Sequence, residues 1–306
     1  VKGRSLASAL SPHPSSPKGP PMQDERSHRT VMRSDAALDL TSDFWMHRHF
    51  RAMAEIYHSL LVQVELLPGD RVLDLGCGSG THFAWIATII GPEGTIAGVD
   101  PDQANLDLAR SRIADAPYRE QIELLHGPLH PLPFPDGSFD AVWCAGSLQY
   151  EPDPVGALQE MARVVRPGGK VAAQDVEMHT MLLGPMPDDL LIALKGTLPH
   201  GETGSEGFVD WFTGHKLRGY FHAAGLREVR GHLRMREYVH PLTEDERGFL
   251  DVAMPYLCTA SPGIHTLSEA QRETLRRLSS LDAAESMFRR PDFTFVEGRA
   301  LAVGLR

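Results

Sequence analysis

Short apolar runs alternate with amphipathic segments through the middle of the chain, between residues 71 and 174. The short runs predict strands at Arg71–Leu75, Thr95–Val99, Ile122–His126, Phe139–Cys144 and Lys170–Gln174. The segments between them predict helices near Thr81–Ile90, Asp102–Ala114 and Pro154–Val165. Strands that alternate with helices are typical of parallel strands joined by right-handed crossovers. The pattern therefore predicts an α/β fold with a doubly wound sheet.

The chain before this core shows two other patterns. Residues 1–34 are rich in Pro, Ser and charged residues and have no apolar period. Such a segment cannot bury enough surface to offset chain entropy, so we expect it to be disordered. We interpret it as an extension or a start-site artefact, with Met22 and Met32 as candidate starts. From residue 35 to residue 67, apolar residues from Phe44 to Val64 recur at roughly helical intervals, which predicts a cap of one or two helices.

Composition narrows the classes of partner. The 306 residues carry a formal net charge of -10, which disfavours capture of nucleic acid, because that depends on neutralising phosphates with Lys and Arg. Cys77, Cys144 and Cys258 are odd in number and far apart, so they form neither a disulfide framework nor a CxxC metal motif. The longest apolar run, residues 83–91, is far shorter than the roughly 20 residues of a membrane helix. We therefore expect a cytoplasmic protein without a membrane span.

A glycine-rich stretch, "RVLDLGCGSGTHFAW", joins the first predicted strand to the first helix. In a doubly wound sheet this turn lies where ligands bind. No Lys follows Gly80, so a Walker phosphate loop is excluded. The dinucleotide pattern G-x-G-x-x-G is weakened, because its sixth position is Thr81 and the third glycine comes one residue early. The remaining interpretation is a D-x-G-x-G-x-G loop that starts at Asp74 and bends the backbone against a ligand without a phosphate.

Two further stretches point the same way. The second strand ends in Asp100, about 20 residues past the loop, as expected for a carboxylate that binds ribose hydroxyls. Downstream, "LPFPDGSFDAV" and "ARVVRPGGKV" follow in order. Together with the loop they cover about a hundred residues, and over these the chain resembles the quinone-biosynthesis (UbiE-like) branch of the class I S-adenosylmethionine-dependent methyltransferases.

This resemblance implies a Rossmann-like sheet of seven strands, six parallel and the seventh antiparallel beside the fifth. Residues 215–224 resemble the last crossover helix, Glu228–Tyr238 the sixth strand and residues 292–305 the seventh. Residues 35–306 would then form a single methyltransferase domain, with its cofactor-binding half at 68–176. Segments 177–214 and 243–291 interrupt this frame, and we expect them to be lids over the substrate, because loops this long are uncommon unless they have structure of their own. Thr243 with Glu246 and Ser268 with Gln271 predict two helix starts there.

The resemblance also implies S-adenosylmethionine as cofactor and S-adenosylhomocysteine as product. The cofactor-binding residues expected from the motifs are Asp74, Gly76, Cys77, Gly78, Gly80, Asp100, Pro101, Asp102, Gly127, Pro128, Leu129, Cys144 and Ala145. Gly76 and Gly78 let the backbone approach the methionine half of the cofactor, where a side chain would collide. The family's usual Gly-Asp-Ala adenine loop reads Gly127-Pro128-Leu129 here, so a backbone carbonyl, His130 or packing against Leu129 must replace the missing carboxylate.

The acceptor side is less defined by the sequence. Methyl transfer depends mainly on holding the acceptor close and excluding water, and an acidic acceptor also needs a base within about 3 Å. Tyr150 and His179 are our candidate catalytic residues, with His200 and His215 as alternatives. The apolar, Met-containing lid predicts a small, partly hydrophobic metabolite methylated at carbon, oxygen or nitrogen, such as a quinone-like or aromatic compound. A cofactor-binding regulator or cyclase that does not methylate is the alternative.

No metal site is predicted. His126 and His130 are separated by Gly127 and Pro128, which excludes a helical pair of ligands. His47 and His49 are two apart on a predicted helix and so point to different faces. The sequence leaves the oligomeric state open.

Overall fold

The structure is a computed structural model that describes residues 43–204, 207–280 and 286–306. The chain divides into two units, Val1–Ala36 and Ala37–Arg306, and the described residues belong to the second. The disorder expected for residues 1–34 lies outside the described residues.

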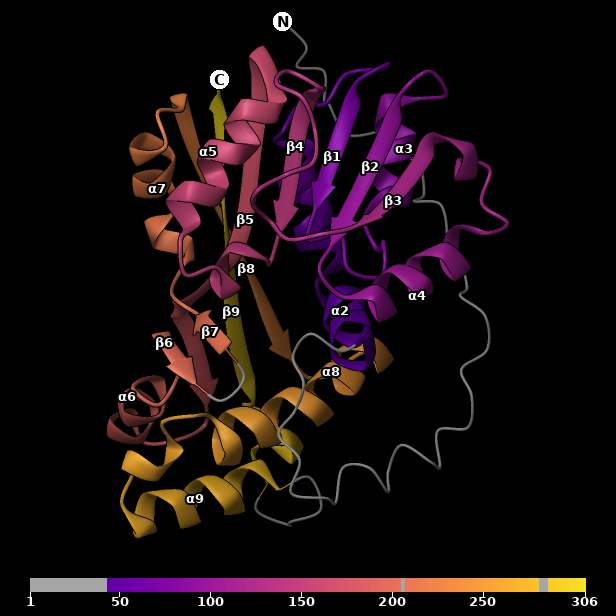
Figure 1. Ribbon diagram of the computed structural model, residues 1–306. Helices are drawn as coiled ribbons and strands as arrows, with labels where there is room; N and C mark the ends of the chain where they lie inside the picture. The colour runs from indigo at the N-terminus through magenta and orange to yellow at the C-terminus, as the bar shows by residue number, and fades with distance from the viewer. Residues whose placement is uncertain (1–42, 205–206, 281–285) are drawn as a thin grey trace, which may run out of the picture. The chain divides into compact units, whose positions relative to one another are not determined.

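One seven-stranded sheet forms the centre of the described fold (Figure 1). Its strands are β1 (Arg71–Leu75), β2 (Thr95–Asp100), β3 (Ile122–His126), β4 (Phe139–Ala145), β5 (Val165–Gly184), β8 (Arg227–Val239) and β9 (Thr294–Leu305). Their order is β3-β2-β1-β4-β5-β9-β8, and β9 is antiparallel to both of its neighbours. The predicted sheet with six parallel strands and one antiparallel strand beside the fifth is confirmed.

Helices cover both faces of this sheet. One face packs against α3 (Phe83–Ile90), α4 (Gln103–Ile113) and the end of α2 (Asp43–Val62). The other packs against α5 (Pro154–Val164) and α7 (Leu217–Ala223). Side chains alternate along each strand, so Val72 joins the first core and Leu73 the second, both fully buried. Burying each such side chain stabilises the fold by about 1.5–3 kcal/mol. The N-terminal cap is thus a single helix, α2, within the described residues.

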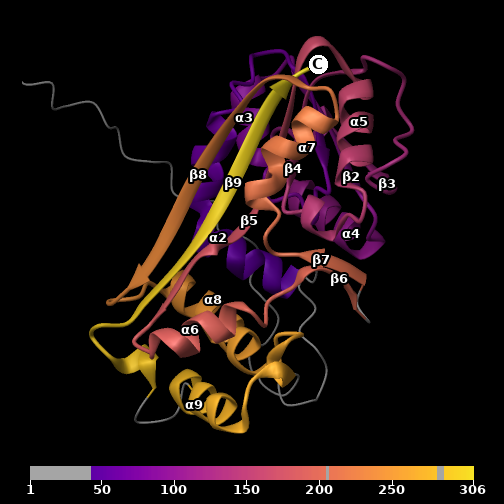
Figure 2. The ribbon, with the colours of Figure 1, turned by 90° about the vertical axis from the view of Figure 1, so that its left-hand side faces the viewer.

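Three strands extend well beyond the edge where β1, β2 and β4 end. β5 pairs with β9 from Lys170 with Leu305 to Gly184 with Thr294, with a register shift between Glu177 and Leu182. Figure 2 shows β8 and β9 side by side along this extension. The predicted strand Lys170–Gln174 is therefore too short, because the strand continues by pairing with β9, a partner more than a hundred residues away in sequence. The first part of the predicted lid is in fact strand.

The two predicted insertions pack together below the sheet as drawn in Figure 1. They contain α6 (Asp188–Lys195), the two-stranded sheet of β6 (His200–Gly204) and β7 (Gly207–Asp210), α8 (Glu244–Pro255) and α9 (Glu269–Ser279). Both predicted capping boxes are present: Thr243 with Glu246 begins α8, and Ser268 with Gln271 begins α9. A third apolar core, which includes Met181, Leu194 and Phe249, lies among these elements and the start of α2. These segments therefore share a core with α2 and with the extended parts of β8 and β9.

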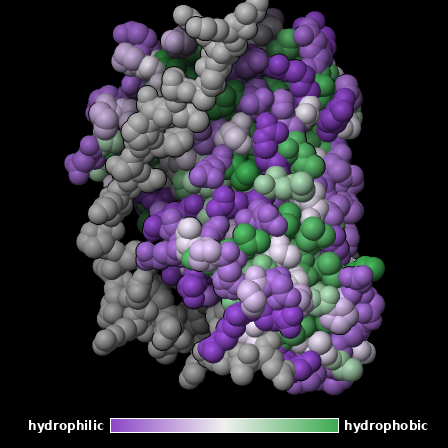
Figure 3. Space-filling model, turned by 180° about the vertical axis from the view of Figure 1, so that it is seen from behind, coloured by the Kyte–Doolittle hydropathy of each residue, from purple (hydrophilic) through white to green (hydrophobic). Residues whose placement is uncertain are grey.

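One face of the molecule shows no single dominant character. Polar and apolar side chains are interspersed on the face seen in Figure 3. None of the helices in the described part of the chain is both long enough and apolar enough to cross a bilayer.

Candidate active site

The glycine loop after β1 is held by backbone hydrogen bonds to the end of β2. The N–H groups of Gly76 and Cys77 donate to the Val99 carbonyl oxygen over 2.8 and 3.0 Å. Gly76 has φ +71°, and a Cβ there would overlap the Ser147 side chain. Gly78 has φ +53°, and its N–H donates to Asp100 Oδ2 over 2.7 Å. Any other residue at Gly76 would be strained and would collide, so the loop can take this path only with glycine.

Asp100 organises the loop from the end of β2. Besides Gly78, its carboxylate accepts the N–H of Asp102 at 3.0 Å and the Asn105 side chain at 3.4 Å. Burial raises the pKa of Asp100, and these hydrogen bonds offset part of that rise. Asp102 in turn caps α4 by accepting from the Ala104 N–H. Each carboxylate oxygen has two lone pairs, and Oδ1 already accepts two hydrogen bonds, so Oδ2 can accept one more from a ligand's hydroxyl.

Asp74 is a buried carboxylate without a hydrogen-bond partner among the described residues. Burial, followed by the nearby charge of Asp100, raises its pKa to about 8. Buried polar groups are nearly always paired, so an orphaned carboxylate beneath a glycine loop marks a place where a donor is missing. Together with the Gly76 and Gly78 positions, it fits a cationic or hydrogen-bonding ligand at this loop.

A cavity of about 390 Å³ runs from the loop toward the insertions. Its loop end is lined by the predicted residues Gly76, Cys77, Gly78, Asp100, Pro101, Asp102, Leu129 and Ala145. Its far end is lined by Trp45, Phe50, Trp211, Phe249, Ala253, Leu257 and Phe295. The volume lies in the range of small-molecule sites, roughly 300–1,000 Å³. One continuous space thus joins a polar backbone loop to an aromatic and aliphatic wall.

Five predicted cofactor residues do not line the cavity: Asp74, Gly80, Gly127, Pro128 and Cys144. Asp74 lies buried at the end of β1. A Cβ at Gly80 would meet the Phe83 ring at 2.6 Å, so this glycine allows α3 to pack close to the loop. Cys144 is buried in the core on the α5 side of the sheet. Met46, Ser79, Thr81, His82 and Asn105 line the cavity without having been predicted to.

The candidate bases are not brought together. Tyr150, in the short helix Leu148–Tyr150, lines the cavity, and Asp175 fixes that helix by accepting the Gln149 N–H at 3.0 Å. His179 does not line it, because neighbouring strand residues face opposite sides and Val176 and Met178 take the cavity side of β5.

The two alternative histidines also lie elsewhere. The His200 ring stacks on Phe212 at 4.1 Å, and the His215 ring lies beside Glu177, so neither lines the cavity.

Burial, reinforced by the charge of Asp175, raises the pKa of Tyr150. Its hydroxyl therefore keeps its proton and acts as a hydrogen-bond donor.

A buried polar cluster at the far end of the cavity was not predicted from the sequence. Tyr57 Oη lies 3.1 Å from His49 Nδ1, and Arg299 Nη2 lies 2.7 Å from His49 Nε2. Glu297 Oε2 lies 3.3 Å from both His49 Nε2 and Arg299 Nη2. All four residues are buried and line the cavity. The signal that could have revealed them is the placing of Glu297 and Arg299 two residues apart, on one face of an otherwise apolar strand.

The charges in this cluster compensate one another. Burial lowers the pKa of His49, so its ring is neutral near pH 7. Burial opposes ionisation of Glu297, but His49 and Arg299 outweigh it and lower its pKa to about 2. Burial likewise disfavours the charged form of Arg299, but the interactions with Tyr57, Glu297 and Asp175 outweigh this effect and raise its pKa. The cluster is therefore an ion pair between Glu297 and Arg299 with a neutral imidazole beside it.

Comparisons with known proteins agree with this geometry. A family model described as a methyltransferase domain matches residues 73–173. A demethylmenaquinone methyltransferase of Desulfitobacterium hafniense is 39% identical over 118 residues, which cover 39% of this chain and 47% of that protein. A phosphoethanolamine N-methyltransferase of Haemonchus contortus, solved with S-adenosyl-L-methionine, has a TM-score of 0.52 at 13% identity, over 87% of this chain and 58% of that one. The [4+2]-cyclase SpnF has a TM-score of 0.50 at 20% identity, over 83% and 81% of the two chains.

Residues 73–173 therefore resemble methyltransferase domains as a class, in agreement with the glycine loop and the strand order. Within that class, the sequence similarity lies with the quinone-biosynthesis branch. The aligned segment spans half or less of the curated relatives it matches. The solved structures, all under 25% identical, support the fold alone.

Proposed function

We propose that the protein transfers a methyl group from S-adenosylmethionine to a small, partly hydrophobic metabolite held in the cavity. The observation that carries this proposal is the single cavity that joins the glycine loop to the buried cluster of His49, Tyr57, Glu297 and Arg299. When bound, the cofactor supplies an electrophilic methyl group on a sulfonium centre. The chain itself positions both reactants and excludes water.

The loop end of the cavity would hold the cofactor. Gly76 and Gly78 would leave room for its methionine end, and the remaining lone pair of Asp100 would accept from a ribose hydroxyl. Asp74 would pair with its ammonium group, directly or through water. Leu129, which lines the cavity, would pack against the adenine in place of the carboxylate that the family's adenine loop usually supplies.

The far end would hold the acceptor. Its aromatic and aliphatic lining favours an apolar ring or chain, and the polar cluster would bind a hydroxyl, carbonyl or amine on it. Arg299 Nη2 can only donate and lies 2.7 Å from His49 Nε2, so the neutral ring accepts there and its Nδ1–H donates to the Tyr57 oxygen. Burial raises the pKa of Tyr57 to about 12, so its hydroxyl would keep its proton and donate a hydrogen bond to the acceptor. Tyr150, which keeps its proton, would donate a second hydrogen bond.

We also propose the domain layout expected from the sequence: one methyltransferase domain over residues 35–306, with the cofactor half at 68–176 and substrate-enclosing insertions at 177–214 and 243–291. The buried core shared by the insertions and the cavity residues Trp211 and Phe249 support it. From the net charge we infer that the acceptor is not a nucleic acid.

The direct test is incubation with methyl-labelled S-adenosylmethionine and a panel of quinone, phenol and amine metabolites, alongside calorimetric titration with S-adenosylhomocysteine. We expect S-adenosylhomocysteine to bind and label to appear in at least one acceptor. Binding without transfer to any acceptor would favour the alternative of a protein that uses the bound cofactor without methylating. Binding of NADH but not of S-adenosylhomocysteine would overturn the proposal.

A matched pair of variants tests the acceptor end. His49→Asn should lower kcat while leaving S-adenosylhomocysteine affinity unchanged, because His49 belongs to the polar cluster at the far end of the cavity. His58→Asn is the control, since His58 is an exposed histidine on the same helix, α2. Equal kcat values for the two variants would remove His49 from the proposed mechanism.

A further inference from the structure

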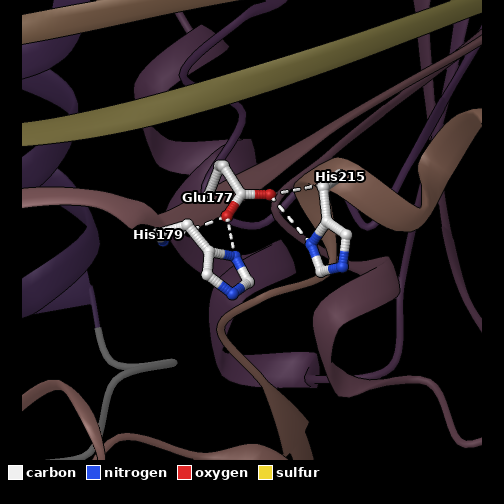
Figure 4. Close-up of side chains that lie close together, drawn as sticks. All are labelled: Glu177, His179 and His215. Atoms are coloured by element: carbon white, nitrogen blue, oxygen red, sulfur yellow. Dashed lines mark hydrogen bonds and ion pairs between the residues drawn. The ribbon is translucent and has the colours of Figure 1, made fainter.

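A second cluster of titratable side chains lies outside the cavity, around Glu177 (Figure 4). Glu177 Oε1 is 2.6 Å from His179 Nδ1, and Glu177 Oε2 is 3.1 Å from His215 Nδ1. Glu177 and His179 belong to β5, and His215 belongs to the short helix Gly214–Lys216. One ligand atom from each residue falls within 4.8 Å of the other two. The fold thus gathers one carboxylate and two imidazoles from positions 38 residues apart.

Backbone hydrogen bonds fix the carboxylate at the centre of this cluster. The side chain of Glu177 is only 6% exposed, and its Oε1 accepts the His179 N–H at 3.0 Å. Its Oε2 accepts the His215 N–H. Each oxygen has a second lone pair, which in the structure faces an imidazole Nδ1. A cation could therefore bind at those second lone pairs without breaking the bonds that orient Glu177.

We propose that Glu177, His179 and His215 form a binding site for a divalent transition-metal ion, with Zn²⁺ as the best-suited candidate. Carboxylate oxygen and imidazole nitrogen are ordinary Zn²⁺ ligands, at about 2.0–2.2 Å from the ion. Two such ligands of one tetrahedral ion lie roughly 3.4 Å apart, so the 3.1 Å contact with His215 needs to widen by about 0.3 Å and the 2.6 Å contact with His179 by about 0.8 Å. Three protein ligands leave one coordination position for water or a small anion.

Solvent can reach the proposed metal site, and neighbouring rings contact its histidines. The side chains of His179 and His215 are 61% and 50% exposed, so an ion can enter from solvent and the rings can adjust. The Phe212 ring contacts the His179 ring at 4.6 Å, and the two imidazoles meet edge to face at 4.8 Å. Among the described residues, the ion pairs that Glu177 makes are with these histidines alone. A bound cation would compensate its buried charge.

The position of the site gives the ion a structural consequence. It would tie β5 to the segment that follows β7. That segment includes Trp211, which lines the cavity and whose carbonyl oxygen accepts the Met178 N–H at 3.1 Å. Binding should therefore stabilise one wall of the cavity from outside, without contact with the reactants. This inference does not depend on the proposed methyl transfer.

The test uses the full chain, without a histidine tag, stripped with a chelator and titrated with Co²⁺ and with Zn²⁺. We expect one ion per chain, visible Co²⁺ absorption bands of the strength typical of four-coordination, and a rise in Tm with Zn²⁺. Glu177→Gln, His179→Asn and His215→Asn should each weaken binding at least tenfold, since even loss of an outer-shell partner costs about 10–100-fold. His222→Asn, at an exposed position on α7, is the matched control and should bind as wild type.

Two outcomes would overturn the site. One is absence of Co²⁺ and Zn²⁺ binding to the wild-type chain at micromolar concentrations. The other is binding that the three variants leave unchanged. His179→Asn alters a largely exposed side chain, so we expect this variant to fold. Circular dichroism verifies the fold, and a loss of metal binding in the folded variant is then not a loss of structure. Activity is not part of this readout, so failure of the metal site leaves the proposed methyl transfer untouched.

Discussion

The two ends of the cavity are built in different ways. The loop end consists of backbone and short side chains that follow β1 and β2 directly, with Gly78 and Asp100 joined by one hydrogen bond. The far end consists of side chains from α2, β5, the loop after β7, α8 and β9, such as His49 and Glu297, which are 248 residues apart. The first is encoded locally, and the second exists only once distant elements have packed. A motif can therefore identify the cofactor end while leaving the acceptor end unseen.

Electrostatics separates the two ends as well. At the loop end, burial raises the pKa of Asp74 to about 8, because no cation lies opposite it among the described residues. At the far end, Glu297 is just as deeply buried, yet its pKa falls to about 2 because Arg299 and His49 stabilise its charge. Burial acts alike on both carboxylates, and the neighbouring charge decides the outcome. Among the described residues, the buried carboxylate at the loop end thus has no cation beside it, whereas the one at the far end is paired with Arg299.

The largest effect is expected from breaking the ion pair at the far end. Arg299→Met leaves the charge of Glu297 buried without its cation, which should cost about 3–5 kcal/mol of unfolding free energy. The combined variant Arg299→Met with Glu297→Gln should recover part of that loss. Urea unfolding of the single and double variants measures both. A double variant less stable than Arg299→Met alone would contradict the ion-pair interpretation.

The next largest effect is expected from a substitution at the loop end. Gly76→Ala combines positive-φ strain with overlap against Ser147, which together should cost roughly 2–5 kcal/mol. We expect S-adenosylhomocysteine affinity to fall by on the order of 100-fold, which corresponds to about 2.7 kcal/mol. Gly91→Ala has nearly the same φ, +69°, with no atom within 4 Å of the added Cβ, and does not line the cavity. It should lose some stability but keep its affinity, and equal affinities in the two variants would refute the steric argument.

A pH series tests the raised pKa of Asp74. The pKa of Asp74 is raised in the folded state, so its contribution to stability is complete below pH 4 and is lost as pH rises to about 8. The slope reaches at most about 1.4 kcal/mol per pH unit. Asp74→Asn should remove this slope and raise stability at pH 8, while Asp107→Asn, an exposed control on α4, should not. Denaturant midpoints from pH 4 to pH 9 provide the measurement, and an unchanged slope in Asp74→Asn would contradict the raised pKa.

The smallest effect concerns the hydroxyl group beside His49. Tyr57→Phe removes one hydrogen bond and keeps the ring, so we expect a loss of about tenfold in kcat, or about 1.4 kcal/mol. S-adenosylhomocysteine affinity should remain that of the wild type. A fall in that affinity with unchanged kcat would place Tyr57 at the loop end instead.

The parts of the molecule that sequence alone predicted share one property: their cause lies within a few residues. The strand ends at Leu75 and Asp100, the positive-φ glycines and both capping boxes follow from local geometry. Even the strand order was predicted, but through resemblance to a family, not from the residues themselves.

What was missed depends on pairing and packing between distant segments. The length of β5 is set by β9, and His49 and Tyr57 become cavity residues only because α2 packs beside β9 and α8. That Met178 lines the cavity and His179 does not could not be predicted, because the alternation that separates them cannot be assigned until the strand is known to continue. The cluster of Glu177, His179 and His215 has no spacing motif for the same reason.

The alternation along β9 has a consequence for how the protein can change. Phe295, Glu297 and Arg299 line the cavity, while farther along the strand Leu301 and Val303 pack in the core beneath α3. Inserting or deleting one residue within this strand would exchange its two faces and turn the charged pair outward. Substitutions here can change the shape and charge of the far end of the cavity, whereas changes in length would remove its charged pair. Diversification by insertion is therefore open to the helical segments between residues 243 and 291 and closed to the strand that carries Glu297 and Arg299.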